Sequence, residues 1–265
     1  MALSNPAFNT PAFTQRGSTV AVPSSTQLDE IYNRPAAGPA QTERMSYDDV
    51  IVKTVVMFVF LLAGGAVGAF FPGLMLPALF VGLGLALVNI FKRTPSPVLI
   101  LAYAIVEGVF LGAISFTLER VPNLEGIVLQ AILGTLIVFG VTLALFASGR
   151  VRATKRATKV FMIAGIAYGV FSLINLGLQL TGVNQDPWGL ASASIGGIPL
   201  GLIIGPLAIL MAAYSLVLDF TSVKNGVESG APRNLGWKAA FGLVLTIVWL
   251  YIEFLRLIAI IRGSN

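Results

Sequence analysis

The chain has 265 residues, of which 56% are hydrophobic and 11% are charged, and its mean hydropathy is +0.85. A soluble domain carries about 25% charged residues, so this composition indicates an integral membrane protein. Cysteine and histidine are both absent, which excludes disulfides, thiolate chemistry, imidazole metal sites and histidine-dependent catalytic triads. The net charge of +5 does not indicate nucleic-acid binding, because the basic residues lie in short segments between apolar runs, without interleaved aromatics.

Residues 1–45 contain five prolines among Ser, Thr, Ala and Asn, and they show no helical or strand period. Such a segment cannot bury enough apolar area to fold, so we predict a disordered cytoplasmic tail over residues 1–45. Its first part, "SNPAFNTPAF", repeats a short N/T-Pro-Ala-Phe unit. The repeat would suit a docking motif for a membrane-protein partner.

Seven apolar runs follow the tail. The first helix is expected to begin near Ser46, whose hydroxyl can cap free amides, with Asp48 and Asp49 in the first turn, where the helix dipole favours negative charge. Each run is close to the roughly 20 residues that a helical crossing needs, and a lipid-exposed backbone must satisfy its own hydrogen bonds. We therefore predict an all-α integral membrane protein in which residues 46–265 form a seven-transmembrane-helix bundle. The runs lie near residues 50–70, 73–91, 98–118, 127–147, 160–181, 195–219 and 239–261.

Lysine and arginine are divided unevenly between alternate loops. The first, third and fifth loops contain only Arg120, whereas ten basic residues lie in the second, fourth and sixth. Because short basic loops stay in the cytoplasm, the tail and the even loops are expected there, and seven crossings place the C-terminus outside. A six-span alternative, with a re-entrant last run, remains open. The ten basic residues are Lys92, Arg93, Arg150, Arg152, Lys155, Arg156, Lys159, Lys224, Arg233 and Lys238.

Several spans carry glycine at four-residue spacing. Small residues at this spacing let membrane helices approach closely, so we interpret these glycines as packing positions. They are Gly64 and Gly68, Gly108 and Gly112, Gly165 and Gly169, and the series Gly197, Gly201 and Gly205.

Four ionisable residues lie inside apolar runs or at their margins: Glu107, Asp219, Glu253 and Arg256. A charge at the bilayer centre costs about 3 kcal/mol or more, and such residues usually face the bundle interior and mark an ion path, a relay or a pair. We interpret all four as candidate proton-sensing and gating residues. Two structural alternatives remain open. Glu253 and Arg256, three apart on one helix, would neutralise each other, and Asp219 would only cap the cytoplasmic end of its span.

Buried carboxyls offer a mechanism for sensing pH. A low-dielectric interior favours the protonated form of a carboxyl, and two carboxyls that share a site hold a proton between them. Loss of that proton would separate them and present oxygen ligands that suit a hard cation such as calcium. With histidine absent, carboxylates are the available sensor.

Three stretches resemble the Bax-inhibitor family of membrane proteins in its bacterial branch. They are "YAIVEGVFLGAIS" in the third span, "YSLVLDF" at the end of the sixth and "WLYIEFLRLIAIIR" in the last. The resemblance covers residues 46–262 and leaves the tail outside it. It implies a bundle with the last helix near the centre, in the bacterial plasma membrane. The resemblance also implies a property of some bacterial members of the family, a pH-sensitive calcium leak in which two aspartates, on the sixth and seventh spans, share a proton. Carried over to this sequence, these acids correspond to Asp219 and Glu253.

The sequence departs from that pattern in two ways. The seventh-span acid is Glu253 rather than an aspartate, and it lies 34 positions after Asp219. At about 1.5 Å per helical residue, Asp219 near the inner end of its span and Glu253 about 14 residues up the last one would differ in depth by about 15 Å. Glu107, near the middle of its run, is therefore the alternative partner for Glu253, with Arg256 as a latch.

These features favour a pH-responsive cation leak channel, with calcium as the expected ion, gated by protonation of buried carboxylates. The alternative is a non-catalytic regulator that binds other membrane proteins, such as a quality-control protease, through the tail. A secondary transporter with helices broken at Pro199 and Pro206 also remains open.

Catalysis is not expected. The Pro-Ala-Leu tripeptide of intramembrane aspartyl proteases occurs at 77–79, but no Gly-x-Gly-Asp follows it and no Gly-x-Ser-x-Gly elbow is present. We therefore expect no enzyme activity, no cofactor, no bound metal and no nucleic-acid partner.

Overall fold

The structure is a computed structural model, and it describes residues 43–183 and 188–263. In this part of the chain seven helices are long and apolar enough to cross a membrane, which confirms the predicted all-α seven-helix class. The predicted tail lies outside the described residues except for residues 43–45. The helices are α3 (Tyr47–Phe70), α4 (Met75–Phe91), α5 (Pro97–Glu119), α6 (Ile127–Ala147), α7 (Lys155–Leu180), α8 (Leu200–Glu228) and α9 (Leu235–Gly263). The short 3-10 turns η2 (Pro72–Leu74) and η3 (Gly189–Ala191) and a hairpin of β1 (Ser194–Ile195) and β2 (Ile198–Pro199) complete the fold.

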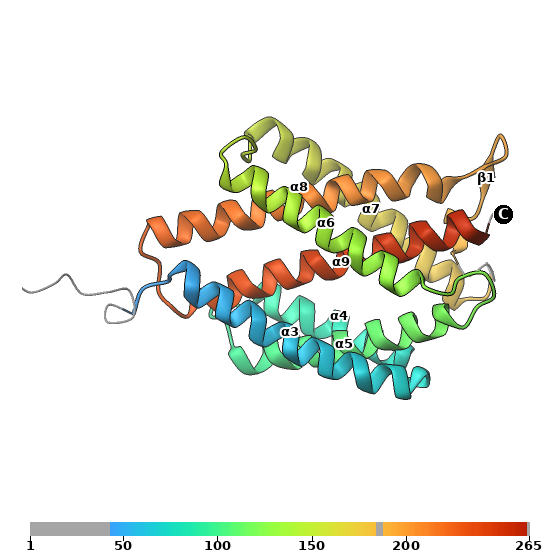
Figure 1. Cartoon of the computed structure of the whole chain (residues 1–265), viewed down its shortest axis with the longest axis horizontal. Helices are drawn as coiled ribbons and strands as arrows, with labels where there is room; N and C mark the ends of the chain where they lie inside the picture. The colour runs from blue at the N-terminus through green and yellow to red at the C-terminus, as the bar shows by residue number, and fades with distance from the viewer. Residues whose placement is uncertain (1–42, 184–187, 264–265) are drawn as a thin grey trace, which may run out of the picture. The chain divides into compact units, whose positions relative to one another are not determined.

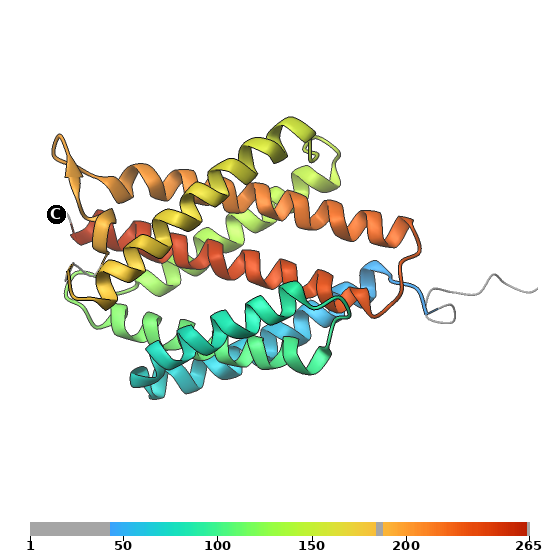
Figure 2. The same ribbon diagram turned by 180° about the vertical axis from the view of Figure 1, so that it is seen from behind.

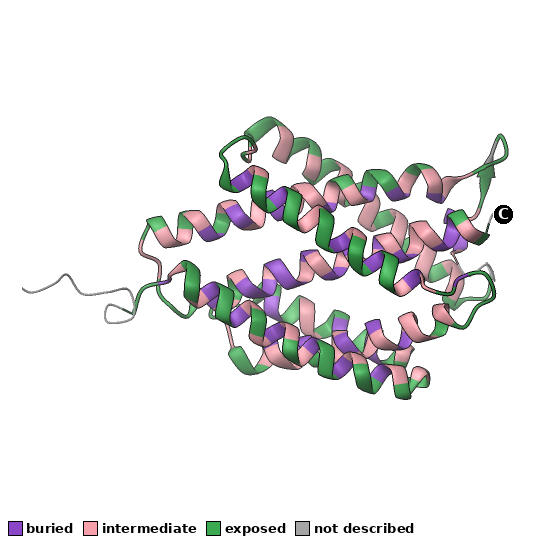
Figure 3. Ribbon diagram, viewed as in Figure 1, coloured by how far each residue is buried: buried purple, intermediate pink, exposed green. Residues whose placement is uncertain are grey.

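The last helix, α9, lies in the middle of the bundle (Figure 1), where it packs against α3, α5, α6 and α8. Twelve of its residues are buried, and Figure 3 shows them spread along its length. By contrast, α7 has no buried residue; it crosses the outside of the bundle (Figure 2) and packs on α8 and η3. The expected central position of the last helix is confirmed. Because α9 is one continuous helix, the re-entrant alternative is wrong.

The sixth apolar run does not form a helix over the predicted range. Its first residues, from 195, belong to the β1–β2 hairpin, whose turn places Gly196 and Gly197 at φ 63° and 86°, a conformation that favours glycine. The helix α8 then continues to Glu228, nine residues beyond Asp219. It is unbroken at Pro206, and Pro199 precedes it, so the broken-helix argument for a transporter does not apply.

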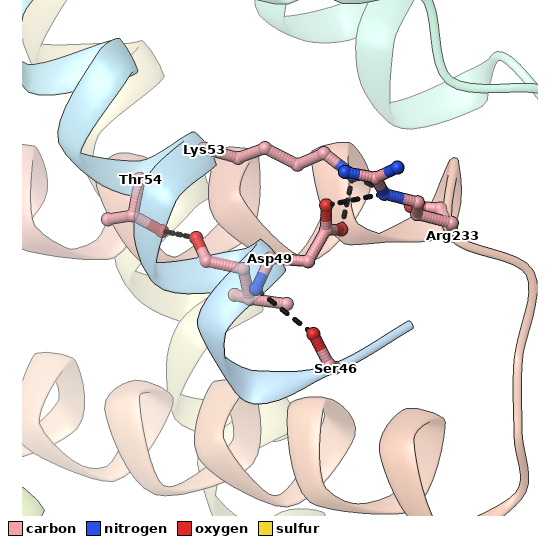
Figure 4. A network of polar contacts seen from close by, with 6 residues as sticks. Ser46, Asp49, Lys53, Thr54 and Arg233 are labelled. Atoms are coloured by element: carbon pink, nitrogen blue, oxygen red, sulfur yellow. Dashed lines mark hydrogen bonds and ion pairs between the residues drawn. The ribbon is translucent and has the colours of Figure 1, made fainter. Parts of the chain in front are cut away.

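The first helix begins as predicted. Ser46 accepts a hydrogen bond from the backbone N–H of Asp49 at 3.2 Å, and both Asp48 and Asp49 lie in the first turn. Asp49 has a second role that the sequence did not indicate, since it also pairs with Lys53 and with Arg233 (Figure 4).

These three side chains form a clamp between the start of α3 and the loop that joins α8 to α9. Arg233 Nε lies 2.9 Å from Asp49 Oδ1, and Lys53 Nζ donates to the Arg233 carbonyl at 2.7 Å. Lys53 is only 8% exposed, so its charge depends on these partners. The backbone N–H of Met45 also donates to Ala231, at 2.7 Å, so two segments distant in sequence are joined at this end of the bundle.

Glycines bring α3 and α5 into backbone contact. A Cβ on Gly68 would lie 2.0 Å from the carbonyl oxygen of Val109, and a Cβ on Gly112 would lie 1.9 Å from that of Gly65. Gly64 and Gly108 are equally close to the facing backbone. Because association within lipid depends on such close approach, the packing role predicted for these four glycines is confirmed.

The other predicted glycines divide into two groups. Gly201 and Gly205 do face α9, where an added Cβ would meet Ile260 and Leu257 at 2.2 and 2.9 Å. The prediction is wrong for Gly165 and Gly169 on the exposed helix α7 and for Gly197 in the hairpin turn. An added Cβ would meet nothing within 4 Å at Gly169 and Gly197, and at Gly165 it would meet Met211 Cε of α8 at 3.9 Å, an ordinary van der Waals distance.

A matched pair of alanine substitutions tests the α3–α5 contact. Gly112→Ala should lower the free energy of unfolding by about 2 kcal/mol, because the helix backbones must move apart. Gly84→Ala on α4, where nothing lies within 4 Å, should leave it unchanged or raise it by up to about 1 kcal/mol through helix propensity. Thermal or denaturant unfolding in mild detergent measures both; equal effects would contradict the assigned contact.

A second pair tests the clamp. Asp49→Asn should lower the free energy of unfolding by about 3 kcal/mol, because it leaves the charge of buried Lys53 without its carboxylate. The neighbouring Asp48 is exposed, so Asp48→Asn should change stability by no more than about 0.5 kcal/mol. The same unfolding assay applies, and an Asp49→Asn protein as stable as the Asp48→Asn protein would show that the clamp contributes nothing.

Candidate functional site

Glu253 lies at the centre of a polar network inside the bundle. It is 2% exposed. Its Oε1 accepts hydrogen bonds from Trp249 Nε1, at 3.0 Å, and from the Tyr168 hydroxyl, while its Oε2 pairs with the Arg256 guanidinium. Arg256 also donates to the Tyr168 hydroxyl oxygen at 2.8 Å. Glu253 and Arg256 therefore form the ion pair that the structural alternative expected.

Two helices supply this network. Trp249, Glu253 and Arg256 are four and three positions apart along α9, so they share one face of the helix. Tyr168 comes from α7, and its ring centroid lies 6.0 Å from that of Trp249. Since α7 packs on the outer side of the bundle, the hydrogen bonds of Tyr168 attach it to the central helix α9. Within the described residues, the buried Nε of Arg256 has no hydrogen-bond partner.

Asp219 occupies a different interface, between α8 and α9. Its Oδ2 accepts a hydrogen bond of 2.6 Å from Thr246 Oγ1, which lies 3.3 Å from the hydroxyl oxygen of Ser215. No ion pair joins it to a basic residue in the described part of the chain. Because α8 continues past it, Asp219 does not cap the end of a helix, and that alternative is wrong.

The structure does not bring Asp219 to Glu253. Asp219 lies level with Thr246, which precedes Glu253 by seven residues on α9, or about 10 Å along the helix axis. Their difference in depth is smaller than the 15 Å expected from sequence, because α8 extends beyond Asp219. A hydroxyl, not a second carboxylate, faces Asp219.

Glu107 is not placed beside Glu253 either. On α5, Tyr103 packs against Phe241 with ring centroids 5.1 Å apart, and Ser115 lies 2.6 Å from the hydroxyl of Tyr251. These two contacts show that α5 and α9 run in the same direction, so Glu107 lies at about the level of Val244 on α9. Val244 precedes Glu253 by nine residues, so the depths of the two glutamates differ by roughly 13 Å. Its carboxylate faces α4, where a Cβ on Gly82 would lie 2.9 Å from Oε2. The expected match in depth between Glu107 and Glu253 is wrong.

The three acids thus have three environments. Glu253 has a cationic partner and Asp219 has a hydroxyl donor, whereas Glu107 has neither an ion pair nor a hydrogen bond within the described part of the chain. Among those residues, no group of three or more acidic side chains is placed to hold a metal ion.

Comparison with known families places this arrangement in context. A family model described as "Bax inhibitor 1 like" matches residues 5–263. The chain belongs to the Bax inhibitor 1 like family. The match begins at residue 5, so it includes most of the segment that we expected to lie outside the resemblance. A search of curated proteins found no match to the chain.

The structure of this Bax inhibitor 1 like protein corrects the expectation that Asp219 and Glu253 form one pair of acids. Asp219, which the resemblance matches to the sixth-span acid, faces Thr246 on α9. Glu253 belongs to the separate network with Tyr168. The residue pair that the resemblance implied is absent at the α8–α9 interface of the described chain.

Sequence reasoning missed four residues that complete these sites: Tyr168, Trp249, Thr246 and Ser215. Trp249 could have been found, because a polar nitrogen four residues before a buried glutamate lies on the same helix face. No local signal identifies Tyr168 or Thr246, since each meets its acid only across a helix interface.

A double-mutant cycle tests the coupling of Glu253 with Arg256. Glu253→Gln should lower the free energy of unfolding by about 3 kcal/mol, because it leaves the guanidinium without its carboxylate in the interior. In the double variant with Arg256→Gln, the loss in free energy of unfolding should be at least about 1 kcal/mol smaller than the sum of the two single losses. Unfolding in detergent supplies the four values, and strictly additive losses would show that the pair is not coupled.

Proposed function

We propose that this protein is a pH-responsive cation leak, with calcium as a permeant ion, gated by protonation of buried carboxylates. The observation that carries the proposal is Asp219, an acid at the interface of the central helix with α8 whose partner is a hydroxyl rather than a cation. Burying a charge without a counter-charge is costly. Protonation removes that charge, and ionisation restores it.

The change in charge of Asp219 between its protonated and ionised forms acts as a gate at the α8–α9 interface. A neutral Asp219 is compatible with close packing, since a Cβ on Gly242 would lie only 3.4 Å from its Oδ1. An ionised Asp219 favours a state in which water or a cation reaches the carboxylate, which requires α8 and α9 to separate. The leak should therefore increase as pH rises.

Glu253 and Arg256 have a latch role in this proposal. Their charges already compensate each other, so loss of a proton elsewhere leaves the pair in place, and its bonds to Tyr168 keep α7 attached to α9. Glu107 is a second candidate sensor at the α4–α5 interface. Single carboxylates bind a cation weakly enough for it to leave again, which conduction requires.

We further propose that the protein lies in a bacterial plasma membrane with its N-terminus in the cytoplasm and its C-terminus outside. The bacterial location is supported by the resemblance of its motifs, and the orientation by the basic residues of alternate loops. The second loop lies beside the first turns of α9, where Lys238 Nζ is 3.5 Å from the Lys92 carbonyl. The alternative function, a regulator that binds membrane proteins through the tail, depends on residues outside those described.

Flux measurements on proteoliposomes test the gate. Calcium entry should rise from about pH 5 to about pH 8, by no more than about tenfold per pH unit if one proton controls it. Asp219→Asn keeps an acceptor for Thr246 but cannot ionise, so its flux should stay low and independent of pH. Asp48→Asn, which changes an exposed acid of the same type, should keep the wild-type profile.

Other outcomes assign the gate differently or remove it. If Glu107→Gln rather than Asp219→Asn flattens the profile, the sensor lies at the α4–α5 interface. If Glu253→Gln alone does so, the latch is the sensor. Wild-type protein that passes no calcium at any pH would contradict the channel proposal.

A further inference from the structure

A groove runs between α3 and α6. Both helices pack on α9, but they do not pack closely on each other. Two cavities of about 640 and 350 Å³ lie between them, share Phe58, and have Leu243 and Ile247 of α9 among their lining residues. We call this combined space the α3–α6 groove.

The groove is open toward the surroundings of the bundle, and its walls are apolar. Ile51 and Val55 on α3 line the larger cavity and are 58% and 55% exposed, and Leu136 on α6 lines the smaller one and is 58% exposed. In a membrane-spanning bundle such side chains face lipid. The groove is therefore accessible to an acyl chain from the side.

The larger cavity has the length of one leaflet. Along α3 it extends from Tyr47 to Phe58, eleven residues or about 16 Å. The hydrocarbon core of a bilayer is about 30 Å thick, so one leaflet contributes about 15 Å. The smaller cavity continues from Phe58 to Gly65, in the other half of the bundle.

Only one end of the larger cavity is charged, and its charge is positive. Arg152 and Lys224 line this cavity, which has no acidic lining residue. Both belong to the basic end of the bundle, near Tyr47, whose aromatic ring is a residue type enriched where lipid headgroups lie. Basic pockets between membrane helices are the sites that bind anionic headgroups.

Both cations remain able to bind a phosphate. Arg152 donates one hydrogen bond, of 2.6 Å, to the Phe146 carbonyl, and its guanidinium carbon lies 4.5 Å from the centre of the Phe146 ring. A guanidinium has five N–H groups, so this contact orients the group and leaves further donors. Lys224 has a 3.6 Å ion pair with Glu228, and exposed pairs of this kind are weak.

We propose that the α3–α6 groove binds a phospholipid with a net negative headgroup, taken from the leaflet at the basic end. Its acyl chain lies along α3 in the larger cavity, and Arg152 and Lys224 bind its phosphate. The lipid bridges two helices, α3 and α6, that do not pack on each other directly. This site does not depend on ion conduction.

Native mass spectrometry of the purified full-length protein tests the proposal. Phosphatidylglycerol and phosphatidylcholine with identical acyl chains are added in equal amounts, and the lipid that stays bound is counted. Phosphatidylglycerol should be retained in preference. Arg152→Gln and Lys224→Gln should each reduce its retention about fivefold, and the double variant about 30-fold.

Two matched controls separate this site from general surface attraction. Arg156→Gln combined with Lys159→Gln removes two charges from the same end but outside the cavity lining, and it should leave retention within about twofold of wild type. Val55→Trp should block the groove, whereas Val59→Trp changes an equally exposed α3 valine, 59% against 55%, that does not line it.

Equal retention of the two lipids by the wild-type protein would overturn the proposal. So would an equal loss from the Arg156 and Lys159 changes, or equal effects of the two tryptophans. Because the tryptophan pair leaves every basic residue in place, it gives a result even if the Arg152 variant does not fold.

Discussion

The interior of this bundle depends on hydrogen-bond partners that other helices offer to polar side chains of the central helix α9. Hydrocarbon offers no hydrogen bonds, so Thr246, Tyr251 and Glu253 of α9 must each find a partner on another helix. They find Asp219 on α8, Ser115 on α5 and Tyr168 on α7. Polar contacts at successive depths thereby position three neighbours around α9.

On the side of α3 and α5, contact between the two helix backbones holds neighbouring helices together. There the glycines let two helices approach until their backbones touch, a contact that depends on van der Waals packing and not on polar groups. The clamp of Asp49, Lys53 and Arg233 then joins this pair to the start of α9 at one end. Helix α6 packs on α9 and α8 instead, and the α3–α6 groove is the space left between the two groups of helices.

The separation of the acids bears on function. An acid with a cationic partner is already compensated, whereas an acid with only a hydroxyl partner changes the charge of its surroundings when it binds or loses a proton. Glu253 and Asp219 represent these two cases about 10 Å apart along α9. The proposed gate, whose acid is on α8, and the proposed latch on α9 therefore do not share a proton.

Much of the fold was predictable from the sequence, because hydrophobic length and glycine spacing are local properties. The seven spans follow from continuous apolar runs, and the cap at Ser46 and the α3–α5 glycines follow from residues within one or two turns of each other. The glycines of α7 looked alike in sequence but bring no helix into close approach, since spacing alone does not say which helix face is covered. The end of α8 was misplaced because polar residues after Asp219 continue the helix beyond the apolar run.

The sequence by itself determined the class of protein, the number of crossings and the presence of charges within the apolar runs, since composition sets how much of a chain can lie in lipid. Only the tertiary structure decided which groups meet. Tyr168 lies 85 positions from Glu253, and Thr246 lies 27 from Asp219, and no local pattern encodes such pairs. They arise when helices pack side by side, because the depth and rotation of each helix are set by all of its neighbours together.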